Sequence, residues 1–127
     1  MRSFKTLTVW EKSHQLTLQI YRESKSFPSD EKFGLTSQLR RASVSVPANI
    51  AEGCGRGTDP ELRRFLEIAM GSASEVEYHL LLARDLGYVP PTRHQELETL
   101  TCEVKRMLAA FIRKLKADHY ESKRKAK

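Results

Sequence analysis

The sequence predicts an all-α protein, an antiparallel up-down-up-down four-helix bundle. Four segments carry apolar residues at spacings of three and four, which is the period of a helix with one buried face. Capping and turn residues separate these segments by short connections, and short connections favour antiparallel packing of consecutive helices. With 127 residues, 39% of them hydrophobic, the chain suits a single domain over residues 1–127 with a modest core.

The first helix is expected from about Val9 to Ser24. Thr8 and Glu11 have the spacing of a capping box, in which two side chains satisfy free backbone amides at a helix start. The apolar positions of this segment are Val9, Trp10, Leu16, Ile20 and Tyr21. Because their spacing is roughly helical, we expect them to face the core.

The second helix follows a turn at residues 27–30. Pro28 disfavours helix in the residue before it, and Ser29 or Asp30 can cap the helix that follows. The apolar stripe then steps by 4, 3, 4 and 4 residues through Leu35, Leu39, Ala42, Val46 and Ile50. A strand around Val46 is rejected because the helical pattern continues on both sides of it.

Two features inside the expected helices are unfavourable by propensity. Pro47 removes one backbone hydrogen bond and clashes with the carbonyl group of Ser43, so we expect a bend unless neighbouring helices hold the segment. Gly71 begins a run of small residues, 71–74, and glycine inside a helix costs about 1 kcal/mol relative to alanine. Close contact with another helix would offset that cost.

The third helix is expected to begin at Pro60. The glycine-rich segment 53–57 ends the second helix, and Thr58 can cap the third, with proline at its first helical position. Its core face consists of Leu62, Phe65, Leu66, Ala69, Ala73, Val76, Leu80 and Ala83. Gly87 and then Pro90 end it.

The fourth helix begins near a second capping box, Thr92 with Gln95. Its apolar stripe consists of Leu97, Leu100, Val104, Met107, Leu108, Phe111 and Leu115. The apolar period fades after Leu115, so we expect a basic tail from about residue 116.

The formal net charge of +6 is concentrated at the C-terminal end. From residue 113 onward, two acidic residues stand against seven cations: Arg113, Lys114, Lys116, Lys123, Arg124, Lys125 and Lys127. Such a segment attracts phosphate backbones or anionic lipid, although many proteins end in a solvated lysine-rich tail. Both interpretations stay open at this point.

Paired arginines flank the glycine-rich segment. Arg40 and Arg41 belong to the second helix, and Arg63 and Arg64 begin the third, so the two pairs could form one patch. The alternative is that they pair with nearby glutamates of the protein itself, which we favour for the pair at 63–64. Arg40 and Arg41 remain candidates for contact with nucleic acid.

The pattern does not favour catalysis or metal binding. A di-metal bundle needs Glu-x-x-His on two helices, and only Glu11 with His14 matches. Glu75 and His79 lie one turn apart, which could support proton transfer, but a surface hydrogen bond is the commoner use of such a pair. We expect no metal, no cofactor and no catalytic residue.

The segment 53–57 resembles a phosphate-binding loop in composition. It lacks the Gly-Lys-Ser/Thr ending, and no strand precedes it, so a helix-ending turn is the favoured interpretation. Cys54 has Arg56 nearby, but no histidine is placed by the sequence to act as its base. We therefore expect Cys54 to be structural.

The chain is expected to reside in the cytoplasm. Its longest apolar run, Leu80–Ala83, is far shorter than the ~20 residues that span a bilayer, and the first residues lack a secretory pattern. Two cysteines, Cys54 and Cys102, are too few for a structural zinc site and are expected to be reduced thiols.

Several strings resemble one family. They are GLTSQLRRA (residues 34–42), VPANIAEGCGR (46–56), RFLEIAMGS (64–72), LLLARDLGY (80–88) and VWEK (9–12). Together they resemble the signature of the four-helix-bundle proteins encoded by intervening sequences within bacterial large-subunit ribosomal RNA genes. The resemblance extends from about Phe4 to Phe111.

The resemblance implies a homopentamer and kinship with the accessory variability protein of diversity-generating retroelements. That relative is a basic pentameric barrel that binds nucleic acid and a reverse transcriptase. The resemblance provides no catalytic residue.

We expect a non-enzymatic, oligomeric helical bundle that binds RNA or an RNA–protein assembly through its basic surfaces. The alternative is a protein scaffold or adaptor, with a polymerase or another protein as partner, whose lysines serve only solubility. A bundle enzyme is disfavoured by the incomplete metal pattern.

Overall fold

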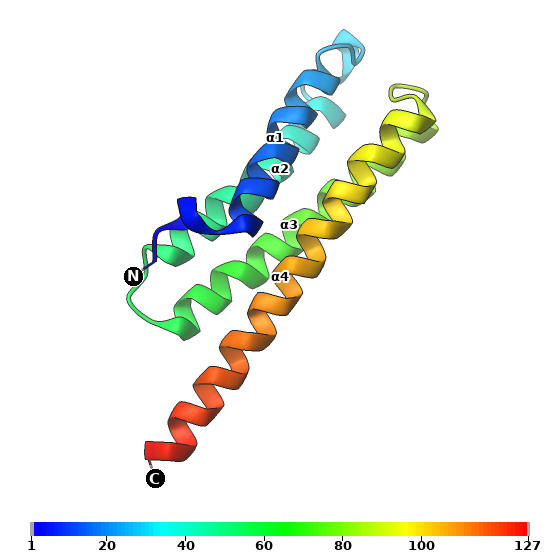
Figure 1. Ribbon diagram of the computed structural model, residues 1–127. Helices are drawn as coiled ribbons and strands as arrows, with labels where there is room; N and C mark the ends of the chain where they lie inside the picture. The colour runs from blue at the N-terminus through cyan, green and yellow to red at the C-terminus, as the bar shows by residue number, and fades with distance from the viewer. Residues whose placement is uncertain (1, 127) are drawn as a thin grey trace.

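The computed structural model describes residues 2–126, which form a bundle of four α-helices (Figure 1). The helices are α1 (Thr8–Ser24), α2 (Leu35–Cys54), α3 (Asp59–Asp85) and α4 (Pro91–Ala126). Two short 3-10 helices, η1 (Phe4–Thr6) and η2 (Ser29–Glu31), precede α1 and α2. Residues 2–126 contain no strand, so the all-α prediction is confirmed.

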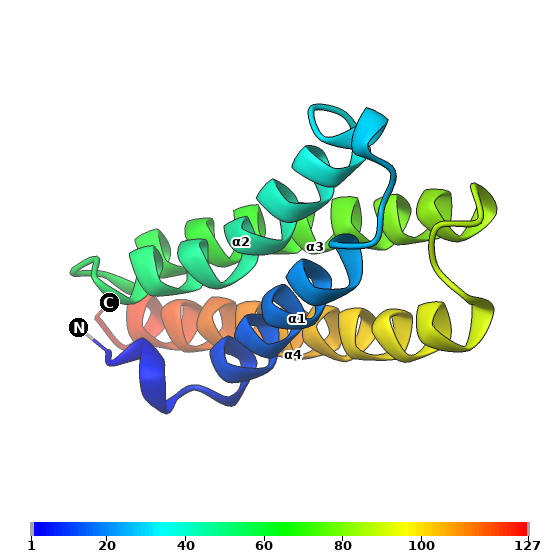
Figure 2. The ribbon, with the colours of Figure 1, turned by 90° about the horizontal axis from the view of Figure 1, so that it is seen from above.

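Helices that pack against each other run in opposite directions. Lys12 on α1 pairs with Glu103 on α4 (Nζ to Oε1, 3.0 Å), whereas Glu23, later on α1, pairs with Arg93, earlier on α4 (2.8 Å). The same reversal holds for the hydrogen bonds Thr17–Ser43 and Ser24–Arg40 between α1 and α2. Each helix packs against the next, and α1 also packs against α4 (Figure 2), as an up-down-up-down bundle requires.

The core consists of two apolar clusters with a layer of buried hydroxyl groups between them. One cluster includes Ile50, Leu66 and Leu108, and the other includes Ile20 and Leu80. The buried hydroxyl groups belong to Ser13, Thr17, Ser43 and Thr101. Each donates a hydrogen bond to a backbone carbonyl group, so the layer avoids the cost of buried unpaired donors.

The predicted core positions are buried with few exceptions. Five of them are half-buried at the edges of the core: Trp10, Phe65, Leu100, Met107 and Phe111. Tyr21 is 40% exposed, so its predicted place in the core is wrong. Its neighbour Ile20 takes the buried position, and the ring of Tyr21 packs against the guanidinium of Arg40, 4.8 Å from the ring centroid.

Capping by Thr58 is confirmed at the start of α3. Its Oγ1 accepts a hydrogen bond from the backbone N–H of Glu61 (3.3 Å). At the start of α2 the predicted cap is wrong, because Ser29 and Asp30 form η2 instead. The carboxylate of Glu31, which precedes α2, accepts a hydrogen bond from the N–H of Leu35 (3.2 Å). It thereby pairs one of the backbone N–H groups that the first turn of α2 leaves free.

The capping boxes predicted at Thr8 and Thr92 are wrong. Both threonines lie inside their helices, so their backbones lack the extended conformation of a cap. In α1, the residue before the helix is Leu7, which offers no side-chain acceptor. In α4, Pro91 occupies the first position, where the fixed φ of proline fits a helix, and this moves the start ahead of Thr92.

α3 ends at Asp85, and Gly87 turns the chain just beyond it, as predicted. The φ of Gly87, +81°, lies in the left-handed region that glycine adopts readily, and it lets the N–H of Tyr88 donate to the carbonyl group of Ala83 (2.9 Å). At the end of α2, Gly55 has φ of −80°, so that end needs no left-handed residue.

α2 continues through Pro47 because α1 satisfies the carbonyl group that the proline leaves free. Pro47 has no N–H to donate to the carbonyl group of Ser43. The hydroxyl of Thr17 on α1 lies 2.8 Å from that oxygen and donates to it. Both Thr17 and Ser43 are buried, so water cannot supply the missing donor, and the Thr17 hydroxyl supplies it instead.

Thr17→Val is expected to lower the free energy of unfolding by about 1–3 kcal/mol, because it leaves the carbonyl group of Ser43 buried without a donor. Pro47→Ala supplies an N–H to the same carbonyl group. The loss in free energy of unfolding is therefore expected to be smaller for the double variant than the sum of the effects of the two single variants, as measured by urea unfolding. Strictly additive effects would contradict the pairing.

Gly53 and Gly71 have opposite surroundings. Gly53 lies inside α2, and a Cβ there would lie 2.9 Å from both Leu62 Cδ1 and Phe65 Cβ of α3. Gly71 is exposed, and a Cβ there would meet no heavy atom within 4 Å. The close helix contact expected at Gly71 is therefore not made within this chain, whereas α2 and α3 do approach closely at Gly53.

Candidate nucleic-acid interface

α4 projects beyond the other helices at its C-terminal end (Figure 1). Its last buried residue is Leu115, and residues 116–126 continue the helix with exposed side chains, apart from the half-buried His119. The expected tail is thus a helical extension of α4, which the apolar period could not reveal because the segment has no core face. Lys127, also a predicted contact, lies outside the described residues.

The helical backbone sorts the charges of residues 113–125 onto two sides. Residues three and four apart share one face of a helix. One face therefore carries the basic stripe, defined as Arg113, Lys116, Tyr120 and Lys123. The other side carries both acidic residues, with two more cations: Lys114, Asp118, Glu121 and Lys125. The basic stripe spans about 15 Å of the helix.

The cations of the extension are mostly unpaired. Arg124 lies 3.6 Å from Glu121, but both side chains are exposed, so this pair contributes little. The other five predicted cations form no ion pair with residues 2–126: Arg113, Lys114, Lys116, Lys123 and Lys125. Lys123 to Lys125 lie in the last turn, where positive charge favours the negative end of the helix dipole.

Arg40 and Arg41 lie toward the opposite end of the bundle. Arg40 is half-buried, and its Nε donates to Ser24 Oγ (2.7 Å), which fastens α2 to the end of α1. Arg41 is exposed and lines a groove of about 320 Å³ between α2 and α3, together with Glu75. Since Arg41 has no ion pair in the described part of the chain, its guanidinium is available to an anion.

Arg63 and Arg64 do not share a patch with Arg41. The groove beside Arg41 reaches Ser72 and Glu75 on α3, which lie 8 to 12 residues beyond these arginines, or about 12–18 Å along the helix. Arg63 pairs with Glu67 (3.6 Å), as the alternative interpretation predicted.

The protein's own side chains occupy the space beside the glycine-rich segment 53–57. The hollow beside it has a volume of about 30 Å³. Thr58 caps the start of α3, and Asp59 pairs with Arg2 (3.5 Å). Burial raises the pKa of the Cys54 thiol, and the charge of Arg2 offsets this only in part. The thiol is therefore protonated at neutral pH, which agrees with a structural role.

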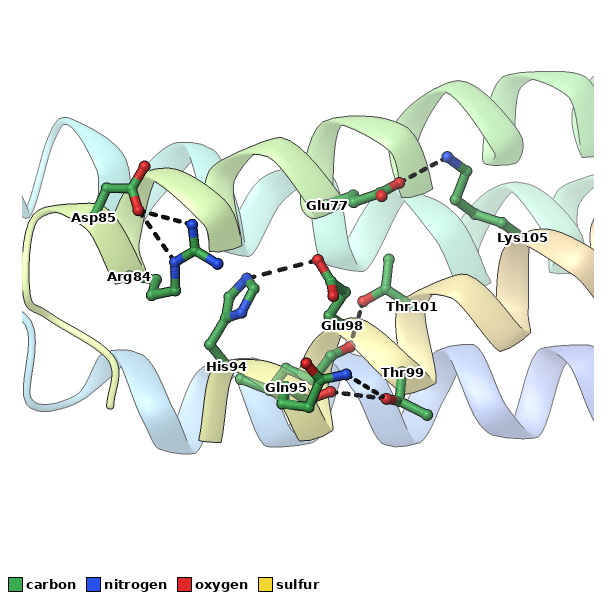
Figure 3. A network of polar contacts seen from close by, with 10 residues as sticks. Glu77, Arg84, Asp85, His94, Gln95, Glu98, Thr99, Thr101 and Lys105 are labelled. Carbon is green, nitrogen blue, oxygen red and sulfur yellow. Dashed lines mark hydrogen bonds and ion pairs between the residues drawn. The ribbon is translucent and has the colours of Figure 1, made fainter. Parts of the chain in front are cut away.

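Figure 3 shows the polar contacts where α3 and α4 face each other, and most of them lie within one helix. Lys105 Nζ lies 2.8 Å from Glu77 Oε1 across the two helices. The buried ring of His94 points toward Glu98 on its own helix, but at 4.0 Å its Nε2 forms no hydrogen bond. Among residues 2–126, no group of three or more His, Cys, Asp or Glu side chains converges as a metal site.

The histidines of the candidate metal motif and of the candidate acid–base pair remain isolated. The ring of His14 stacks on Trp10 at a centroid distance of 5.0 Å, within the bundle's own packing. His79 Nε2 lies 3.9 Å from Glu75 Oε2, which exceeds hydrogen-bond distance, so the predicted surface hydrogen bond is not formed.

These features define a class of protein: a basic four-helix bundle whose last helix extends past the core. No helix in residues 2–126 is long and apolar enough to cross a membrane. The chain belongs to the 23S rRNA-intervening sequence protein family, whose model matches residues 5–110. This confirms the resemblance seen in the sequence, and it leaves the basic stripe beyond the matched residues.

A solved structure shares the fold. It is the crystal structure of a protein with unknown function from the S23 ribosomal protein family of Bacteroides thetaiotaomicron, with a TM-score of 0.77. The two chains are 24% identical, and the similarity covers 83% of this chain and 98% of that one. No curated protein matches the chain.

Proposed function

We propose that this protein is a non-enzymatic, cytoplasmic, oligomeric bundle that binds RNA through its basic stripe. The observation that carries the proposal is the C-terminal end of α4 from Arg113 onward, in which unpaired cations share one face while both acidic residues lie on the other. A row of lysine and arginine side chains of this kind suits a phosphate backbone. The name of the family refers to an intervening sequence of 23S rRNA and not to a ligand, so it only makes RNA the first nucleic acid to test.

The binding is expected to depend on charge and little on RNA sequence. Contacts to phosphates release condensed counterions, so each one contributes roughly −0.7 to the slope of log affinity against log salt on a single strand. Tyr120 is 66% exposed within the basic stripe and can stack on a base of any identity.

The test compares two pairs of charge removals. Lys116→Gln with Lys123→Gln removes two cations from the basic stripe, and Lys114→Gln with Lys125→Gln removes two from the acidic side. The first variant is expected to lose about ten-fold or more in affinity for an unstructured RNA and to flatten the salt slope by roughly 1.4. The second is expected to lose distinctly less in filter binding.

Equal losses would mean that only net charge matters, which would contradict the stripe. RNA affinity that neither variant changes would instead favour the alternative, a protein scaffold or adaptor for a reverse transcriptase or another protein. Salt-independent capture of such a partner would then separate the two functions.

The oligomer is proposed as a homopentamer, as the family resemblance implies. Exposed apolar side chains on α3, among them Ile68 (42%) and Tyr78 (58%), lie to either side of the open Gly71 and suit contact with a second copy of the chain. Light scattering at micromolar concentration is expected to give a mass about five times the 14.6 kDa of one chain. A monomeric mass would contradict the proposal, and Ile68→Glu is expected to lower the mass of the assembly.

A further inference from the structure

Phe33 is the most exposed large apolar side chain of the described residues, at 88%. It lies in the connection between η2 and α2, at the end of the bundle opposite to the extension of α4 (Figure 1). A hollow of about 340 Å³ lies beside it, lined by side chains from the end of α1 and the start of α2. We call these residues the Phe33 surface: Tyr21, Lys32, Phe33, Thr36, Ser37, Arg40 and Arg41.

The Phe33 surface is positively charged. Lys32 and Arg41 are exposed, and neither forms an ion pair in the described part of the chain. A second hollow of about 390 Å³ adjoins the first through Lys32, Thr36 and Arg40, and it adds Lys25. Consecutive phosphates of a nucleic acid strand could therefore lie along this row of cations.

The carboxylates near the Phe33 surface are mostly engaged elsewhere. Glu23 pairs with Arg93 (2.8 Å). Glu31 accepts hydrogen bonds from the N–H of Leu35 and from the hydroxyl of Tyr88 (2.9 Å). The bond to Glu31 also raises the pKa of the Tyr88 hydroxyl, so it stays a donor at neutral pH. Asp30 is the remaining exposed acid of this connection, and Glu75 lies beside Arg41 in the groove between α2 and α3.

The Tyr21 ring and the backbone that carries Phe33 are held in place before any ligand arrives. The Arg40 guanidinium lies over the ring of Tyr21 and bonds to Ser24, so Tyr21 is fixed against α2. The backbone on both sides of Phe33 is tied back to η2, since the N–H groups of Lys32 and Gly34 donate to Ser29 and Glu31. The Lys32 ammonium lies 5.4 Å from the Phe33 ring centroid, which sets a cation beside the ring.

We propose that the Phe33 surface binds single-stranded RNA, with a base stacked on Phe33 and phosphates held by Lys32 and Arg41. This inference rests on the proposed function and gives the RNA a second contact site on each chain. Base stacking on an exposed ring tolerates any base, and neighbouring cations supply affinity for the backbone. The combination fits a strand of nucleotides better than an anion without bases, because the anion would leave the ring unused.

The test uses a short fluorescent oligoadenylate RNA, with inorganic polyphosphate as a probe that has charge but no bases. In the full-length chain, Phe33→Ala is expected to weaken oligoadenylate binding by about 5-fold to 150-fold, the range for losing one stacked base. It should leave polyphosphate binding unchanged, whereas Arg41→Gln should weaken both. Phe33→Tyr should restore the affinity for oligoadenylate, and Leu86→Ala, which removes an exposed apolar side chain without a ring, should have no effect.

The outcomes separate this inference from the proposed function. If Phe33→Ala binds oligoadenylate normally while removal of the basic stripe abolishes binding, the proposed function stands and the Phe33 surface is overturned. If Phe33→Ala changes the mass in light scattering, the ring contacts another copy of the chain and the inference also fails. If Phe33→Ala weakens binding and the stripe variants do not, the Phe33 surface stands without the basic stripe.

Discussion

A chain that ends at Leu115 is expected to keep its bundle and to lose RNA affinity by on the order of 100-fold at about 50 mM salt. The deletion removes four described cations, and it removes no buried side chain, since Leu115 is the last buried residue of α4. The salt slope is expected to fall by roughly 3, because each lost phosphate contact removes about 0.7 on a single strand. Filter binding over a series of salt concentrations measures both quantities.

Thermal unfolding provides the control for this deletion. The extension contributes no buried side chain to the core, and isolated helices of this length are marginally stable in water. Its removal should therefore change the unfolding transition little. An oligomer would enhance the effect on RNA, because several extensions on one particle raise the effective concentration of those still free. Equal RNA affinity of the two chains would reject the extension as the binding site and leave the Phe33 surface or a scaffold role.

Gly53→Val is expected to destabilise the fold by about 3 kcal/mol or more, the upper part of the range for overpacking. The new Cβ would lie 2.9 Å from Leu62 Cδ1 and from Phe65 Cβ, and 3.3 Å from the backbone oxygen of Leu62. The leucine methyl group can move, but Phe65 Cβ and the carbonyl group belong to the backbone frame of α3. The two helices must therefore separate, which urea unfolding would measure.

Gly71→Val is the matched control. It makes the same substitution inside a helix but meets no neighbouring atom within this chain, so its effect is expected within about 0.5 kcal/mol. Similar losses at both positions would mean that helix propensity, and not the approach of α2 to α3, explains the effect. Light scattering on the Gly71 variant would also reveal a contact between chains at that position.

The sequence predicts the bundle well because its main signal is local. Leu39, Val46 and Ile50 follow one another at helical spacing, and burying that stripe is what drives the helix to pack. The same reasoning placed Tyr21 in the core and was wrong there, since one residue of rotation at a helix end decides between a buried and an exposed side chain. Capping boxes were wrong where a proline or a preceding turn moved the helix start.

The candidate interface was predicted only as a set of cations. Their count and their position along the chain follow from the sequence, but their arrangement depends on whether residues 116–126 form a helix. That segment has no apolar face, so its periodicity carried no signal. The exposed ring of Phe33 was missed because a single phenylalanine beside a lysine is indistinguishable from a core residue until its surroundings are known.

By itself, then, the sequence determined the fold class, the stripes of the four helices and the excess of positive charge, since each depends on residue type and on spacing within one segment. The tertiary structure alone decided that Thr17 supports Pro47, that Gly53 is where two helices meet, and that the two sets of predicted cations lie at opposite ends of the bundle. These features join residues that are distant in the chain. They depend on how one helix is set against another, and no local pattern encodes that relation.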